Sequence, residues 1–326
     1  MSTAEPTASR PASPLLNLRG AVAAEGADAG VAAHYGDLFR EQRELSQGRA
    51  FTDLSHRGVV TVTGPDRLSW LHLLLTQHVS ELPPGQATEA LILSPHGHVE
   101  HALSLVDDGT TTWAHVEPGT QAALLDYLQR MRFMYRVELA DATDEFAVVF
   151  LPAGSTADPG PAAAVRELPY GRDLFVPRAQ LAEAVAGYGS PAGVLAYEAL
   201  RIEEHRPRLG FETDHRTIPH EVGWLETAVH LNKGCYRGQE TVARVHNLGR
   251  PPRRLVLLHL DGTEEVLPPH GTEVTLDGRQ VGFVTSSARH FELGPVALAL
   301  VKRNTPVDAE LRAGTVPAAQ EVVVAP

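Results

Sequence analysis

The sequence contains one cysteine, Cys235, among 326 residues. A single cysteine excludes an internal disulfide and a metal cage built from cysteines, and it fits a reducing compartment. Basic side chains are also scarce, because 28 Lys and Arg stand against 40 Asp and Glu and give a formal net charge of −12. This balance argues against nucleic acid or an anionic membrane as the main partner, so any basic site must be local.

Long apolar runs and several well-known motifs are missing too. Stretches such as residues 146–151 and 255–258 are far shorter than the roughly 20 apolar residues that cross a bilayer. The absence of a Walker loop, a GxGxxG motif and a GxSxG motif argues against nucleotide-driven chemistry and a serine hydrolase. Residues 1–30 are rich in Ala, Pro, Gly, Ser and Thr and contain no apolar stretch of signal-peptide length. We therefore expect a cytoplasmic protein with a disordered tail over residues 1–35.

The rest of the sequence has the composition of a folded protein. Hydrophobic residues make up 43% of the chain, and its length predicts two or three domains. Helix patterns begin at Asp66 and Thr120, and strand patterns occupy residues 57–63, 90–94, 99–106, 111–116 and 137–139. The resulting order β-α-β-β-β-α-β contains the split βαβ pattern of ferredoxin-like folds, with one extra strand. We expect a first α+β unit over residues 36–140.

Two further regions follow along the chain. Residues 141–249 predict a second α+β unit, with a strand at 146–151, a Gly/Pro/Ala-rich loop at 152–164 and helices near 180–185 and 194–205. Residues 250–326 predict short strands at 254–260, 273–276, 280–286 and 296–301, with an Asp277-Gly278 hairpin turn. The expected fold class is α+β, in which units built on antiparallel sheets precede a small C-terminal β-barrel or sandwich.

The most unusual segment is KGCYRGQE at residues 233–240, which contains the lone cysteine. Lys233 and Arg237 place two cations near a thiol that reacts only as a thiolate. A helix starting at Gln239 would direct its positive end toward the same thiol. Gly234 and Gly238 permit backbone angles that other residues avoid. The alternative is that Cys235 is a small buried hydrophobe in a tight turn.

This run resembles the signature of the YgfZ-type folate-binding proteins, which are related to the aminomethyltransferase (T-protein) of glycine cleavage. Upstream, YEALRIE at residues 197–203, followed by residues 207–210, resembles the family's pterin-contacting segment, and IPHE at 218–221 resembles the next turn. Residues 62–79 resemble the family's first strand and helix, and residues 248–253 and 281–286 resemble its C-terminal barrel. The resemblance covers about residues 50–305.

The resemblance implies three domains arranged as a ring around a channel that holds tetrahydrofolate or another reduced folate. It also implies a protein that supports the assembly or repair of iron–sulfur enzymes, with those enzymes or assembly proteins as partners. Carried over by position, Cys235 is the functional thiol and Lys233 sets its charge environment, while the folate contacts are Tyr197, Arg201, Glu203, Tyr236 and Gln239. A carboxylate such as Glu203 accepts two parallel hydrogen bonds from ring and amino N–H groups. The alternative for Glu203 is a solvated charge on a helix.

One departure from the aminomethyltransferase pattern concerns residues 97–103, which read GHVEHAL. Aminomethyltransferases carry acidic residues at this place, after the hairpin turn that follows their first helix, and no aspartate is present here. Glu100 offers a carboxylate, although strand alternation places it and His101 on opposite faces. We therefore expect no glycine-cleavage activity, while folate-dependent aminomethyl transfer stays an alternative function and the question of any turnover stays open.

Two other classes of function compete with this reading. His96, His98 and Glu100 lie two residues apart, so an extended strand would place them on one face as a zinc or non-haem iron set. Against ligation, Pro95 and Gly97 place His96 in a turn. The second competitor is an interaction scaffold without small-molecule chemistry. Binding of tetrahydrofolate separates the folate protein from both.

Overall fold

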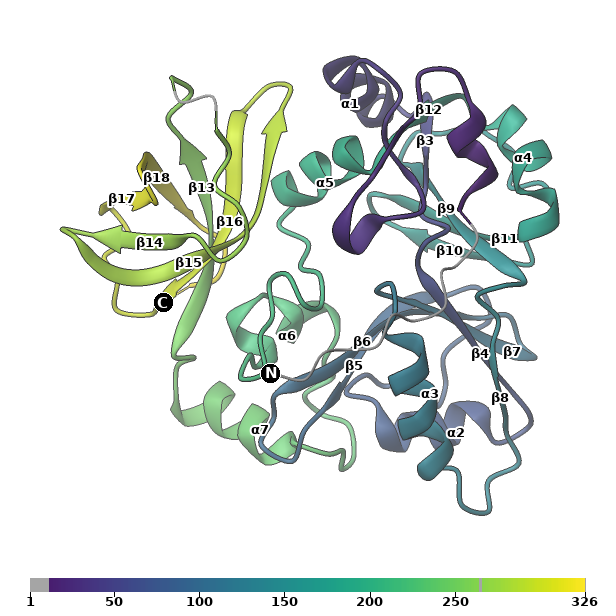
Figure 1. Cartoon of the computed structure of the whole chain (residues 1–326). Helices are drawn as coiled ribbons and strands as arrows, with labels where there is room; N and C mark the ends of the chain where they lie inside the picture. Colours follow the sequence, from purple (N-terminus) through teal and green to yellow (C-terminus); the bar gives the residue numbers. More distant parts are fainter. Residues whose placement is uncertain (1–11, 264–265, 326) are drawn as a thin grey trace. The chain divides into compact units, whose positions relative to one another are not determined.

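The computed structural model describes residues 12–263 and 266–325. These residues divide into two compact units, each assembled from separate stretches of chain (Figure 1). Unit 1 comprises residues 12–67, 83–87 and 104–197, and unit 2 comprises residues 68–82, 88–103 and 198–325. The boundaries expected after residues 140 and 249 left open whether the units are contiguous, and in this division the chain passes between the two units several times.

One sheet of unit 1 has the strand order β10-β11-β9-β3-β12. Its strands are β3 (Ala50–Asp53), β9 (Phe146–Pro152), β10 (Ala164–Leu168), β11 (Gly171–Pro177) and β12 (Ser190–Ala192). Neighbouring strands are antiparallel except β12, which runs parallel to β3. Short helices accompany this sheet: α1 (Leu38–Ser46), η3 (Arg178–Gln180), α4 (Leu181–Ala184) and η4 (Val185–Gly187). Apolar residues of β9 and β11 pack with Leu181 and Val185 in one core.

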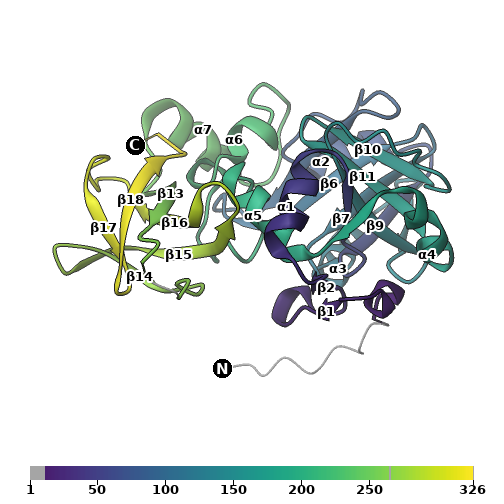
Figure 2. The ribbon, with the colours of Figure 1, turned by 90° about the horizontal axis from the view of Figure 1, so that it is seen from above.

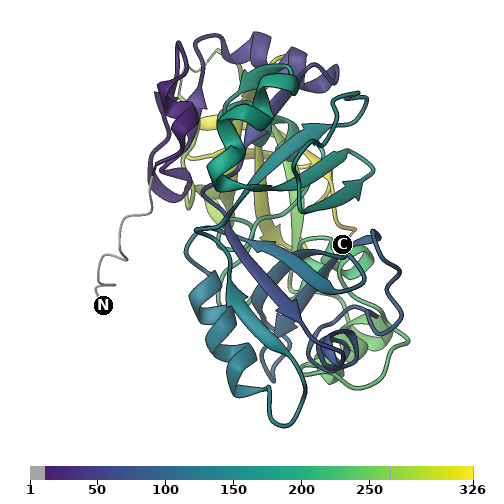
Figure 3. The same ribbon diagram turned by 90° about the vertical axis from the view of Figure 1, so that its right-hand side faces the viewer.

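A second five-stranded sheet has the order β5-β6-β7-β4-β8. Its strands are β4 (Gly58–Thr63), β5 (Ala87–Leu93), β6 (Val99–Asp107), β7 (Thr111–Val116) and β8 (Glu138–Asp141). Helix α2 (Arg67–Leu74) follows β4, and helix α3 (Gln121–Arg130) packs on β4 and β8 within unit 1 (Figures 1 and 3). Leu124, Tyr127 and Leu128 form the buried face of α3, as the spacing of a helix requires. The predicted order β-α-β-β-β-α-β is confirmed.

The expectation of a disordered tail over residues 1–35 is wrong for the residues that the structure describes. Residues 12–35 form η1 (Pro14–Asn17), β1 (Val22–Ala23), η2 (Gly26–Asp28) and β2 (Ala32–His34). Leu15 is 2% exposed in the core of unit 1, and the Ser13 hydroxyl donates to Asp53 at 2.5 Å. Composition missed this segment because its order depends on contacts with distant residues. Residues 1–11 lie outside the described residues.

Besides α2, unit 2 contains several helices that pack around one apolar core. They are the end of α5 (Val194–Glu203), which crosses the division between the units, and η5 (Pro219–Glu221), α6 (Trp224–Thr227) and α7 (Gln239–Leu248). Ile202, Trp224 and Val242 pack together with Leu255 and Leu298 of the barrel described next. This shared core fixes the helices against the barrel.

Residues after 252 form a closed barrel in the strand order β13-β16-β15-β14-β17-β18 (Figure 2). The strands are β13 (Arg253–Leu260), β14 (Glu273–Leu276), β15 (Arg279–His290), β16 (Gly294–Lys302), β17 (Glu310–Ala313) and β18 (Val316–Val322). Asp277 and Gly278 join β14 to β15 with φ of 49° and 74°, which confirms the predicted hairpin turn. The expected α+β class with a C-terminal β-barrel is therefore confirmed. None of the helices in the described part of the chain is long and apolar enough to span a membrane.

Candidate functional site

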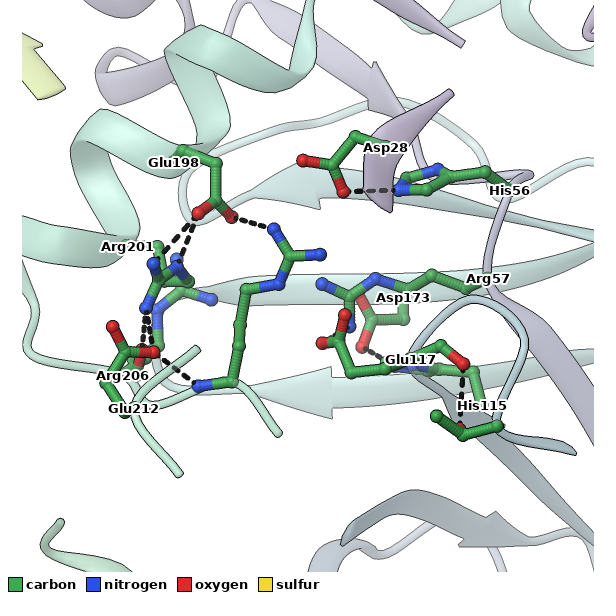
Figure 4. Close-up of polar contacts among 12 residues, drawn as sticks. Asp28, His56, Arg57, His115, Glu117, Asp173, Glu198, Arg201, Arg206 and Glu212 are labelled. Atoms are coloured by element: carbon green, nitrogen blue, oxygen red, sulfur yellow. Dashed lines mark hydrogen bonds and ion pairs between the residues drawn. The ribbon is translucent and has the colours of Figure 1, made fainter. Parts of the chain in front are cut away.

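Arg201 is the centre of a buried polar network in unit 2 (Figure 4). Its guanidinium, in a side chain on α5, donates to Glu198 Oε2 at 3.0 and 2.8 Å and to Glu212 Oε2 at 3.1 Å. It also donates to the Arg206 carbonyl at 2.5 Å and to Ser286 Oγ at 2.8 Å. These bonds occupy all five N–H groups of the guanidinium. Arg201 is 1% exposed, so a ligand would have to displace one of these partners.

Glu212 is the second carboxylate that bonds Arg201. Its carboxylate is fully buried and accepts hydrogen bonds from Thr285 and Ser286 of β15 at 2.9 and 2.6 Å. The backbone N–H of Arg208 donates to it at 2.8 Å, and the Arg208 guanidinium lies 3.1 Å from Glu198. Glu198 and Glu212 were not predicted as buried residues, because a charged residue in or near a helix pattern is usually solvated. The network fixes α5 to barrel strand β15.

Glu203 is the last residue of α5. Its side chain is 39% exposed, and Oε2 lies 3.1 Å from Nε2 of the buried His290. The structure therefore presents a carboxylate that is accessible and held at one oxygen. Nothing in the sequence pointed to His290, which lies 87 residues further along the chain.

Lys233 of the KGCYRGQE segment is 6% exposed and lies at the end of helix α2. Its ammonium donates to the carbonyl oxygens of His72 and Leu75 and, at 3.3 Å, to that of Gln77. Burial lowers the pKa of Lys233 to about 8. Carbonyls at the end of a helix lack partners within the helix and favour a cation, so Lys233 caps α2. Its predicted role in the charge environment of the thiol stays a prediction.

Gly238 fixes the other end of the same segment. It has φ of +84°, and a Cβ atom there would lie 2.6 Å from the Ser94 carbonyl oxygen and 3.0 Å from Gly97 Cα. Gly97 in turn faces the side chain of Thr241. The turn between β5 and β6 therefore packs directly on the start of α7. Gly234 differs, because its φ is not positive and a Cβ there would meet nothing within 4 Å.

Cys235 lies between these two anchors and is exposed. This placement contradicts the alternative of a small buried hydrophobe. Helix α7 begins at Gln239, as expected. Arg237, the second predicted cation, forms an ion pair with Glu100 at 2.9 Å. The pair offsets part of the positive charge that the sequence placed beside the thiol.

The other predicted folate contacts have mixed surroundings. Tyr197 lies in unit 1, is 6% exposed and packs its ring edge-on against Phe150 at 5.1 Å between centroids. Tyr236 is 8% exposed beneath the Lys233 ammonium, and burial raises its pKa to about 12. Gln239 is half-buried and donates to the Lys233 carbonyl at 3.4 Å. Among these three, the two tyrosines serve packing in the structure, and their contact with a ligand stays a prediction.

The alternative metal set is not assembled. The rings of His96 and His98 are 6.2 Å apart between centroids, and Glu100 is engaged with Arg237. Within residues 12–263 and 266–325, no group of three His, Cys, Asp or Glu side chains is arranged to hold a metal ion. His101 is partly buried, and burial lowers its pKa.

Unit 1 has a buried polar cluster of its own, also drawn in Figure 4. Asp173 lies 3.0 Å from His115 Nε2 and 2.8 Å from Arg166, and all three side chains are at most 4% exposed. Burial lowers the pKa of His115. Burial alone would raise the pKa of Asp173, but His115 and Arg166 lower it overall. The signal in the sequence was a pair of charged residues inside each of two short stretches, at 164–168 and 171–177.

Comparison with known proteins agrees with this architecture. Residues 16–158 match the model of the GCVT N-terminal domain, and residues 253–324 match that of the glycine cleavage T-protein C-terminal barrel domain. An aminomethyltransferase of Geobacillus kaustophilus is 30% identical over 302 residues, which cover 81% of this chain and 82% of that protein. The chain belongs to the aminomethyltransferase superfamily.

Two other proteins are also similar to this chain. The chloroplastic protein At1g60990 of Arabidopsis thaliana is 28% identical over 291 residues. The aligned residues cover 77% of this chain and 66% of the plant protein. The crystal structure of aminomethyltransferase T from Bartonella henselae has a TM-score of 0.81 with 19% identity and covers 94% of both chains. This structural match shows that the aminomethyltransferase fold extends over nearly the whole chain.

Proposed function

We propose that this member of the aminomethyltransferase superfamily binds tetrahydrofolate or another reduced folate, with Glu203 accepting hydrogen bonds from the pterin. The observation that carries the proposal is the Glu203 carboxylate, which is 39% exposed at the end of a helix fixed by the Arg201 network. A charge-assisted hydrogen bond to an accessible, well-placed carboxylate is among the stronger polar contacts that a protein offers.

The chemistry of the residues present fits a reduced pterin at Glu203. A pterin ring presents neighbouring N–H groups, and a carboxylate accepts them in parallel. Arg201 is proposed to support helix α5 and not to contact the pterin, since its N–H groups are already bonded to protein atoms. Bound tetrahydrofolate would supply a carrier for one-carbon units. The chain's own contribution is to hold the carboxylate in place.

Calorimetry with tetrahydrofolate tests this proposal. Glu203→Ala should weaken binding by roughly ten- to a hundred-fold, because the charge-assisted contact is lost. Glu273→Ala is the matched control, since Glu273 is an exposed carboxylate on β14 of the same unit. No heat of binding with the native chain would reject the folate proposal and favour an interaction scaffold. Equal affinities for the native chain and Glu203→Ala would remove Glu203 from the site.

The second part of the proposal is that Cys235 is a functional thiol in a YgfZ-type protein that supports iron–sulfur enzymes. Its support is the exposure of Cys235 on a segment anchored by Lys233 and Gly238, together with the KGCYRGQE resemblance. A thiol held on a fixed loop is accessible to a partner protein. Restoration of iron–sulfur enzyme activity in a deletion strain measures this role.

Aminomethyl transfer is the other candidate function, and the names of several relatives favour it. Against it, residues 97–103 contain no aspartate, Glu100 is paired with Arg237, and His101 is partly buried. Loss of a positioned acid or base removes about a hundred- to ten-thousand-fold in rate. We therefore expect no turnover in a reconstituted glycine-cleavage assay, and normal turnover would establish the transferase function instead.

A further inference from the structure

His290, the last residue of strand β15, contacts the Glu203 carboxylate with a fixed ring orientation. Its side chain is fully buried, and Nε2 lies 3.1 Å from Glu203 Oε2. The other ring nitrogen, Nδ1, accepts hydrogen bonds from the backbone N–H groups of Glu292 and Leu293 at 3.2 and 3.1 Å. Since Nδ1 accepts two N–H groups, it carries no proton. The neutral ring therefore has its proton on Nε2 and donates it to Glu203.

We propose that His290 is a positioning residue that fixes the Glu203 carboxylate for ligand binding. The inference rests on the proposed function, in which Glu203 contacts the pterin. A partly exposed glutamate at a helix end otherwise samples several rotamers, and ordering them opposes binding. The His290 Nε2–H bond orders the carboxylate before the ligand arrives. Oε2 of Glu203 is then bonded to His290, while the carboxylate stays accessible to a ligand.

The local chain explains why the donor is so well placed. Residues 291–293 form the short turn between β15 and β16, and Gly294 follows with φ of +73°. This turn directs the N–H groups of Glu292 and Leu293 back at the ring of His290. The ring also packs on Phe291, with 4.8 Å between centroids. Residues 291–294 thus fix the position of the imidazole ring and determine which of its nitrogens carries the proton.

Two substitutions of His290 distinguish the contribution of Nδ1 from that of Nε2. Asn carries an acceptor near the position of Nδ1, so His290→Asn can keep the turn while losing the donor to Glu203. Gln carries an N–H donor near the position of Nε2, so His290→Gln can keep the bond to Glu203. Tetrahydrofolate affinity should fall about three- to ten-fold in His290→Asn, the range for one ordinary hydrogen bond, and stay closer to native in His290→Gln.

A double-mutant cycle distinguishes positioning from general support of the fold. If His290 acts through Glu203, His290→Asn should have no further effect on affinity in the Glu203→Ala background. Thermal midpoints of all variants report whether they fold. An equal loss of affinity from His290→Asn in both backgrounds would overturn the proposal, as would native affinity in His290→Asn.

A second measurement keeps this inference separate from the folate proposal. Nitrogen-15 NMR of the imidazole in the native full-length chain should show a neutral ring protonated at Nε2, with a shift that changes in Glu203→Ala. A ring protonated at Nδ1, or a signal indifferent to Glu203→Ala, would overturn the positioning role whatever the ligand result. If the signal is as expected but tetrahydrofolate does not bind, the folate proposal fails and the His290–Glu203 contact stands without that ligand.

Discussion

The network around Arg201 and the segment at residues 233–240 both lie in unit 2 but differ in the exposure of their polar side chains. Around Arg201, charged side chains are buried, and all the N–H groups of one guanidinium are bonded to protein atoms. In the second region, Cys235, which we propose as the functional thiol, is exposed. Lys233 and Gly238 on either side of it are tied to helix α2 and to the turn before β6.

The difference shows that residues of a conspicuous motif can have structural roles that the sequence does not reveal. Lys233 donates hydrogen bonds to carbonyl groups at the end of helix α2. Gly238 allows its backbone to pack closely against the backbone of Ser94 and Gly97. Charges that look solvated in the sequence, such as Glu212, are buried instead. We therefore expect substitutions in the Arg201 network to act on stability, and substitution of Cys235 to act on function alone.

Arg201→Met should have the largest effect on stability. Removing the guanidinium leaves Glu212 buried without its main cation, and breaking a buried ion pair from one side costs about 3–5 kcal/mol in the free energy of unfolding. Arg130→Met is the control, because the ion pair of Arg130 with Asp126 is exposed and should matter little. Urea denaturation of both variants measures the difference. Similar losses for the two arginines would break the comparison.

The sequence predicted most elements correctly where a local pattern determined them. The strands and helices from β4 to β8 follow apolar periodicity, and the turn at Asp277 and Gly278 follows from backbone preference. Short strands such as β12 were missed, because a three-residue strand is specified by its partner β3 rather than by its own pattern.

The candidate site was harder to predict than the fold. The family resemblance predicted Cys235 and Glu203 as site residues from two separate segments, but the partners of these segments lie far away in sequence. Arg201 bonds Ser286 across 85 residues, and Lys233 bonds Leu75 across 158 residues. A single sequence contains no signal for such pairings, so the structural roles of Arg201 and Lys233 and the contribution of His290 could not be derived from it.

His220 sharpens the comparison, because it is buried like Arg201 but lacks its hydrogen bonds. Its side chain is 7% exposed, and neither ring nitrogen has a hydrogen-bond partner in the described part of the chain. Burial, with a smaller contribution from His246, lowers the pKa of His220 to about 4. At pH values between this pKa and the unfolded pKa of about 6.5, His220 is protonated in the unfolded chain and neutral in the folded chain.

The stability contributed by neutral His220 is therefore complete above pH 6.5 and falls as the pH drops toward 4, by up to about 3 kcal/mol. His220→Phe removes the titrating group and should flatten the dependence of the free energy of unfolding on pH over this window. Urea denaturation at several pH values between 7 and 4 measures both slopes. Parallel slopes for the native chain and His220→Phe would contradict the prediction.

Gly238→Ala should have a smaller effect, which tests how the thiol segment is held. Alanine there would adopt a positive φ and meet backbone atoms of Ser94 and Gly97, at a cost of about 1–3 kcal/mol. Gly234→Ala is the matched control on the other side of Cys235, because it has open space and no positive φ. Thermal midpoints compare the two. If Gly234→Ala destabilised the chain as much, the anchor at Gly238 would not be what holds the segment.

Cys235→Ser should have the smallest effect on stability and the clearest effect on function. The side chain is exposed, so replacing sulfur with oxygen buries no unpaired hydroxyl, and the anchors at Lys233 and Gly238 are untouched. The thermal midpoint and the tetrahydrofolate affinity should stay native. The variant should nevertheless fail to restore iron–sulfur enzyme activity in a deletion strain, since it has lost the proposed thiol.

Labelling with iodoacetamide connects that outcome to the surroundings of the thiol. Because Cys235 is the one cysteine in the chain, modification reports on it without ambiguity. Glu100→Gln should speed the labelling at fixed pH, because it removes the negative charge that pairs with Arg237, two residues from the thiol in sequence. Slow labelling of the folded native chain, together with full complementation by Cys235→Ser, would show that this segment is a structural element like the Arg201 network and that the contrast between the two regions is false.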